Sequence, residues 1–157
     1  MSSSSAAESL YAPSALVSFL KRTEGSDLRG LKRWKVVYRP LICPFHELLA
    51  LIPTGARCFD MGCGAGTFLR LVAETRLPTS LGGIEISREL VDSTSERLRE
   101  WQGARRFEVY DGMAIPEWVA DYEYVTMIDV LHHIPAHQQD TFLRSLFDKM
   151  APGAKLI

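Results

Sequence analysis

The stretch that decides the fold is "CFDMGCGAGTFL", residues 58–69, in which three glycines occupy alternate positions directly after an apolar run. The apolar run indicates a buried strand, and residues 67–76 have the apolar spacing of a helix. Glycines at such a turn let the backbone bend tightly and let a ligand approach within contact distance. The stretch therefore predicts a strand, a ligand-binding loop at Gly62, Gly64 and Gly66, and a helix.

The rest of the sequence alternates in the same way between strand and helix patterns. Apolar runs indicate five strands, at 56–62, 80–87, 105–112, 123–131 and 154–157. Helical spacing of apolar residues follows three of them, at 67–76, 88–101 and 135–150. Such alternation predicts an α/β protein with a doubly wound, open, mostly parallel sheet. In these sheets, ligands bind at the carboxyl ends of the strands.

Composition limits the class of protein further. The chain has 157 residues and a formal net charge of -1, so neither nucleic acid nor an acidic membrane surface is an expected partner. No apolar run approaches the roughly 20 residues of a membrane span. The three cysteines form no C-x-x-C pair, which favours a reduced, cytoplasmic setting. We expect two parts: a flexible tail with a helical cap at 1–52 and a ligand-binding domain at 53–157.

The acid two residues before the first glycine indicates the charge of the ligand. Dinucleotide loops follow the pattern G-x-G-x-x-G, but here Thr67 stands at the position of the third glycine. Asp60 would also repel a pyrophosphate, whereas it suits a ligand with positive charge. S-adenosylmethionine carries a sulfonium and an ammonium group and has no phosphate. The residues therefore favour S-adenosylmethionine over NAD as the ligand.

Five motifs from Cys58 to Ile157 together resemble the class I S-adenosylmethionine-dependent methyltransferases, which have a Rossmann-like fold. They are "FDMGCGAG", "GIEIS", "YDG", "VTMIDVLHHIP" and "MAPGAKLI". The resemblance implies that Glu85 binds both ribose hydroxyls, that Asp111 faces the adenine edge and that Gly112 leaves room beside the ring. The cofactor-binding residues that it implies are Asp60, Gly62, Cys63, Gly64, Gly66, Glu85, Ile86, Asp111, Gly112 and Asp129.

Two histidines, His132 and His133, lie at the expected end of the fourth strand, where the family brings the methionyl end and the acceptor together. Either histidine can accept a proton from the acceptor, and this makes both candidate catalytic residues. The alternative is that the pair shapes the pocket. Some relatives hold a divalent cation here through acidic ligands, but His132 replaces an acid and hard cations prefer oxygen. We therefore expect no metal. Cys63 is expected to fill space in the loop.

The expected function is S-adenosylmethionine-dependent methyl transfer to a small-molecule acceptor at oxygen, with nitrogen and carbon left open. Tyr38 and Arg39 are candidates for acceptor recognition. The alternatives are an NAD(P)-dependent oxidoreductase and a non-catalytic nucleoside-binding domain.

The resembling family has seven strands, so a chain that ends at "AKLI" is expected to be truncated after strand five. This leaves open whether the chain is active by itself. Its fifth strand would expose an apolar edge that favours self-association.

Overall fold

The computed structural model describes residues 12–23, 34 and 36–157. It divides into two compact units, Met1–Pro53 and Thr54–Ile157. The small polar segment at 1–9 lies outside the described residues. The first unit contains α2, η1 and α4, at Pro13–Thr23, Arg39–Leu41 and Phe45–Leu51. Within this unit, the Lys21 ammonium group lies 5.0 Å from the centre of the Tyr38 ring.

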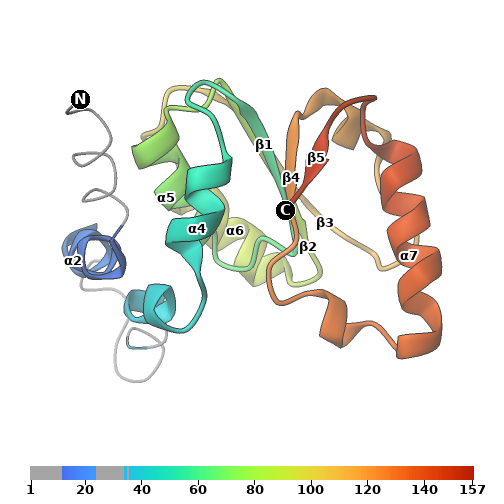
Figure 1. The fold of residues 1–157 in the computed structure, drawn as a ribbon, viewed down its shortest axis with the longest axis horizontal. Coiled ribbons are helices and arrows are strands. Elements are labelled where there is room, and N and C mark those ends of the chain that lie inside the picture. The colour runs from blue at the N-terminus through green and yellow to red at the C-terminus, as the bar shows by residue number, and fades with distance from the viewer. Residues whose placement is uncertain (1–11, 24–33, 35) are drawn as a thin grey trace. The chain divides into compact units, whose positions relative to one another are not determined.

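The second unit is built on a five-stranded sheet with the order β3-β2-β1-β4-β5 (Figure 1). Every neighbouring pair is parallel, which confirms the predicted doubly wound fold. The strand order reverses between β1 and β4, which is the position in such sheets where ligands bind at the carboxyl ends of the strands. The strands are β1 Arg57–Met61, β2 Ser80–Glu85, β3 Ala104–Val109, β4 Tyr124–Thr126 and β5 Lys155–Leu156.

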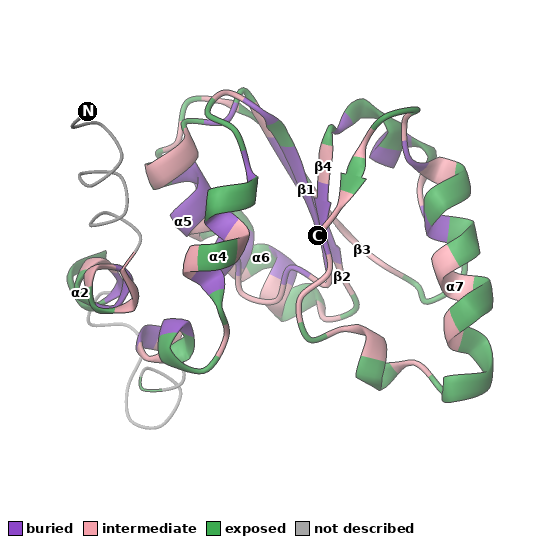
Figure 2. Cartoon of the chain, viewed as in Figure 1, coloured by how far each residue is buried: buried purple, intermediate pink, exposed green. Residues whose placement is uncertain are grey.

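Helices cover both faces of this sheet. In Figure 1, α5 and α6 lie on one face, and α7 lies on the other. These helices are α5 Thr67–Arg76, α6 Arg88–Arg97 and α7 Ala136–Lys149. Ser87 begins α6 as the cap residue, because its hydroxyl accepts a hydrogen bond from the Leu90 amide at 3.4 Å. Figure 2 shows β1 and β2 buried along most of their length, as central strands of a covered sheet should be.

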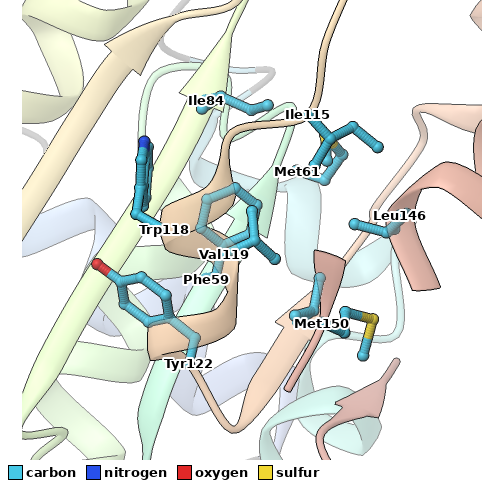
Figure 3. Close-up of a cluster of buried hydrophobic side chains, with 10 residues drawn as sticks. Phe59, Met61, Ile84, Ile115, Trp118, Val119, Tyr122, Leu146 and Met150 are labelled. Carbon is cyan, nitrogen blue, oxygen red and sulfur yellow. The ribbon is translucent and has the colours of Figure 1, made fainter. Parts of the chain in front are cut away.

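A cluster of buried apolar side chains lies between the sheet and α7 (Figure 3). Phe59 and Met61 of β1 are fully buried in it, together with Val119 from the short helix η2 at Glu117–Asp121. Because side chains alternate along a strand, Asp60 projects to the opposite face. A Cβ atom at Gly82 would lie 2.5 Å from the Tyr122 ring, so this glycine makes room for the aromatic side chains of the core.

Two details differ from the sequence-based expectation. The fourth strand was expected at 123–131, but β4 ends at Thr126, and a 3-10 turn, η3, follows at Leu131–His133. Asp129 has a φ of 57°, a left-handed conformation that interrupts extended structure. The Met127 amide still donates to the Ile157 carbonyl at 3.1 Å, and the apolar residues after it leave the sheet instead of extending it. In α7, Phe147 belongs to the apolar residues at helical spacing that indicate a buried stripe over 135–150, but it is 55% exposed.

Strand β5 lies at one edge of the sheet and pairs with β4 through Lys155 and Leu156. The expectation that copies of the chain associate along this edge stays a prediction. Sedimentation over a range of protein concentrations tests it, because an edge pairing should raise the mean mass with concentration. A mass that stays monomeric throughout would contradict it.

Candidate functional site

The glycine loop follows β1 and has a backbone that favours glycine at all three predicted positions. The φ angles of Gly62, Gly64 and Gly66 are 74°, 55° and 77°, in the left-handed region. The loop is tied to the end of β2, because the amides of Gly62 and Cys63 both donate to the Ile84 carbonyl, at 2.8 and 3.0 Å. The sequence from β1 to α5 thus forms a tight and anchored turn.

The three glycines differ in what surrounds them. A Cβ atom at Gly62 would overlap Cγ2 of Val130, and one at Gly66 would lie 2.8 Å from Cγ2 of Thr94. At Gly64, no atom lies within 4 Å of the Cβ position. The outer glycines therefore serve internal packing, and Gly64 faces open space. The open side of the loop is where a ligand can approach the backbone.

Asp60 lies at the end of β1 with its side chain 3% exposed. The Thr126 hydroxyl donates to its Oδ1 atom at 2.7 Å. Burial raises the pKa of Asp60 to about 7. The hydrogen bond from Thr126 lowers this pKa in part, and the negative charge of Glu85 raises it further. A positive group placed beside Asp60 would favour its ionised form. The site therefore contains a buried acid that a cation can stabilise.

Glu85 lies at the end of β2, beside the loop. Its Oε2 atom accepts a hydrogen bond from the Gly64 amide at 3.0 Å, and its Oε1 atom accepts one from the Ser87 amide at 3.2 Å. A carboxylate oxygen can accept more than one hydrogen bond, so Glu85 keeps acceptor capacity for hydroxyl groups of a ligand. The next residue, Ile86, is 70% exposed and offers an apolar surface there.

Asp111 and Gly112 form a turn just after β3. The Asp111 carboxylate accepts a hydrogen bond from the Met113 amide at 2.8 Å, and Gly112 has a φ of 81°. No atom lies within 4 Å of the Cβ position of Gly112. Just before the turn, the Tyr110 amide donates a hydrogen bond to the Glu85 carbonyl. This bond keeps the turn next to the end of β2. Both residues are exposed, and they have room for a ligand edge.

The Cys63 side chain is buried inside the loop. Burial, and then the charge of Asp60, raise the pKa of its thiol well above the usual range. A Cβ atom at Gly83 would lie 3.0 Å from that of Cys63, so the glycine in β2 makes room for this side chain. A buried, protonated thiol is a poor nucleophile, which agrees with Cys63 as a space-filling residue.

An open cavity of about 360 Å³ lies where the chain leaves β4. Its lining contains His132 but not His133, and the two imidazole rings are 4.0 Å apart. Gln139 of α7 holds the wall of the cavity, because its Nε2 atom donates to the carbonyls of Leu131 and Ile134, both at 3.0 Å. The lining residues are Met127, Asp129, Val130, Leu131, His132 and Gln139. Of the two candidate histidines, His132 is thus the one beside this cavity.

The part of the chain that the structure describes contains no group of three or more His, Cys, Asp or Glu side chains that could hold a metal ion. Within the same residues, no helix is long and apolar enough to span a membrane.

Three residues that support the site were missed by sequence reasoning: Thr94, Thr126 and Gln139. Thr94 had a usable signal, since it lies on the same helical stripe as Val91 and Leu98 but is polar. The contacts of Thr126 and Gln139 depend on which segments the fold brings together. Nothing in their local sequence indicates those contacts.

These features together form a candidate ligand-binding site at the carboxyl edge of a doubly wound sheet. The residues fit S-adenosylmethionine, because a buried acid suits its positive charge and the open Gly64 leaves space against the backbone. A model of the methyltransferase-domain family matches residues 59–156. The chain belongs to this family, the class I S-adenosylmethionine-dependent methyltransferases.

Two curated relatives are similar over much of the chain. A trans-aconitate 2-methyltransferase of Variovorax paradoxus is 34% identical over 72% of this chain and 42% of its own length. A carboxy-S-adenosyl-L-methionine synthase of Trichodesmium erythraeum is 26% identical over 76% of this chain and 48% of its own length. The chain thus spans less than half the length of each.

Two solved structures share the fold. A methyltransferase from Thiobacillus denitrificans in complex with S-adenosyl-L-homocysteine has a TM-score of 0.53 and 20% identity, over 71% of this chain and 45% of that one. The phosphoethanolamine N-methyltransferase 1 of Haemonchus contortus has a TM-score of 0.64 and 15% identity, over 92% of this chain and 32% of that one. At these identities the likeness concerns the fold alone.

Proposed function

We propose that this chain binds S-adenosylmethionine at the carboxyl edge of its sheet and transfers the methyl group to an oxygen atom of a small-molecule acceptor. The observation that carries the proposal is the buried Asp60 beside an open glycine loop, with Glu85 at the end of the next strand. When bound, S-adenosylmethionine supplies a methyl group on a positively charged sulfur. The work left to the protein is to bind, orient and exclude water.

Six of the ten predicted cofactor residues have a direct role in this proposal. Asp60 attracts the cationic amino-acid end of the cofactor, and Glu85 accepts hydrogen bonds from the ribose hydroxyls. Ile86, Asp111 and Gly112 flank the adenine ring, since all three are exposed near the ends of β2 and β3. The backbone at Gly64 lies against the nucleoside where no side chain intervenes.

The acceptor would enter the cavity beyond β4, where His132 and Asp129 lie. Two of the similar curated proteins are named for trans-aconitate, a tricarboxylate whose nucleophilic atoms are carboxylate oxygens. A carboxylate is already ionised at pH 7, so such an acceptor needs no general base. His132 would then orient the acceptor, and it would act as a base only for a hydroxyl acceptor.

Transfer of a labelled methyl group from S-adenosylmethionine to trans-aconitate tests the proposed activity. We expect a methyl ester, formed at the same rate with and without a chelator, because His132 replaces an oxygen ligand for a metal. A product methylated at nitrogen or carbon from an acceptor panel would contradict the oxygen assignment. Loss of activity on chelation and its recovery with Mg²⁺ would make Asp129, His132 and His133 candidate metal ligands.

Replacing Glu85 with alanine should weaken the binding of S-adenosylhomocysteine far more than replacing Cys63 with alanine. The first variant removes a charged acceptor of hydrogen bonds, worth about 1.5–3 kcal/mol, or roughly 10- to 150-fold in affinity. The second removes a buried thiol whose hydrogen bond to the Gly64 carbonyl is a long one, at 3.9 Å. Titration calorimetry of both variants measures the difference. Equal losses would show that Glu85 does not contact the ribose.

A further inference from the structure

A buried threonine on α6 holds the loop that the cofactor is proposed to meet. The structure describes two buried side chains in this helix, Val91 and Thr94, and Thr94 is completely buried. A polar group in such a place must have a partner, because burying an unsatisfied hydroxyl is costly. The Thr94 hydroxyl donates to the Gly64 carbonyl at 2.9 Å, across 30 residues of sequence.

Gly64 is therefore held through both of its backbone polar groups. Its amide donates to Glu85 at 3.0 Å, and its carbonyl accepts from Thr94 at 2.9 Å. The two partners come from different elements, the end of β2 and the middle of α6. Gly64 is also the loop glycine whose Cβ position faces open space. Two side chains from outside the glycine motif thus hold its orientation, and the Cys63 thiol adds a weaker hydrogen bond to the same carbonyl at 3.9 Å.

Thr94 also fits against the third glycine of the loop. A Cβ atom at Gly66 would lie 2.8 Å from Thr94 Cγ2 and 2.9 Å from Thr94 Oγ1. The absence of a side chain at Gly66 is what lets the threonine reach Gly64. Gly66 and Thr94 are therefore matched in shape. The hydroxyl of the threonine bonds to Gly64, and its methyl group packs beside Gly66.

We propose that Thr94 is a positioning residue that fixes the Gly64 carbonyl and so holds the loop in the form that receives the cofactor. The proposal rests on the proposed function, because it assumes that the open side of this loop is the binding surface. Thr94 itself is buried behind the loop and acts through Gly64. Because its hydroxyl already orders the loop in the free protein, the loop loses less conformational entropy when the ligand binds.

The test compares Thr94→Val, which removes the hydroxyl at nearly constant shape, with Thr94→Ser, which keeps it. Ser95→Ala is the matched control, since the neighbouring Ser95 hydroxyl bonds to the Val91 carbonyl in its own helix.

The first measurement is amide hydrogen exchange at Gly64 and Gly66 in the free protein. We expect about fivefold faster exchange in Thr94→Val, the equivalent of about 1 kcal/mol, and wild-type exchange in Thr94→Ser and Ser95→Ala. Unchanged exchange in Thr94→Val would overturn the proposal.

The second measurement is the affinity for S-adenosylhomocysteine, taken well below the melting temperature of each variant. We expect about fivefold weaker binding in Thr94→Val and recovery in Thr94→Ser. A lower melting temperature with wild-type affinity would mean that Thr94 only stabilises the fold, which contradicts a positioning role. A wild-type protein that binds no S-adenosylhomocysteine would contradict the proposed function instead, and hydrogen exchange would still decide whether the hydroxyl holds the loop.

Discussion

The free energy of unfolding of the ligand-free protein should fall as the pH rises from about 4 to 7, and Asp60→Asn should remove most of that fall. The pKa of Asp60 is raised by burial from 3.8 to about 7 in the folded state. Between these values the folded protein keeps the proton and the unfolded chain releases it. Stability therefore falls by about 1.4 kcal/mol per pH unit, to a total of about 4 kcal/mol.

Below pH 4 both states hold the proton, and above pH 7 both have lost it, so the contribution of Asp60 is constant outside this window. Urea unfolding at pH 4, 5.5 and 8 measures the change. Asp92→Asn, at an exposed position of α6, is the matched control and should follow the wild type. Parallel stability curves for Asp60→Asn and wild type would contradict the account of Asp60 as a buried acid that is poorly stabilised without its ligand.

Replacing Gly62 with alanine should destabilise the protein by about 2–5 kcal/mol. A left-handed backbone costs an L-residue roughly 1–2 kcal/mol, and an overpacked methyl group adds about 1–3 kcal/mol. Both costs apply, since Gly62 has a φ of 74° and its Cβ atom would overlap Val130. Typical domains are stable by only about 5–15 kcal/mol, so this single methyl group should remove a large share. Urea unfolding at constant pH measures it.

Gly153→Ala separates the two costs. Gly153 has a φ of 86°, but nothing lies within 4 Å of its Cβ position. Alanine at this position therefore adds backbone strain alone. We expect Gly62→Ala to be clearly more destabilising, and Val130→Ala to relieve part of the difference in the double variant. Equal costs at the two glycines would show that Val130 does not pack against the loop.

Much of the fold could be predicted because its signals are local. The glycine loop, the parallel strands and the cap at Ser87 all follow from spacing and residue type within short segments. The end of β4 could not be predicted in this way. Residues 123–131 are almost continuously apolar, yet a left-handed Asp129 turns the chain out of the sheet, and Met127, Val130 and Leu131 line a cavity instead.

The residues that support the candidate site were harder to predict from the sequence than its acidic residues. Asp60 and Glu85 stand next to strand ends, where the fold class alone indicates a ligand site. Thr126 and Thr94 contact that site across 66 and 30 residues of sequence, so their importance depends on tertiary contacts. A polar residue on an apolar helical stripe, as at Thr94, is the local pattern that points to such a support.

The measurement that tests the central claim most directly is a calorimetric titration of this chain with S-adenosylhomocysteine and, separately, with NAD. The account predicts saturable heat with S-adenosylhomocysteine and none with NAD, because Asp60 suits a cationic ligand and Thr67 stands where a dinucleotide loop has its third glycine. Saturable heat with NAD and none with S-adenosylhomocysteine or S-adenosylmethionine would contradict it.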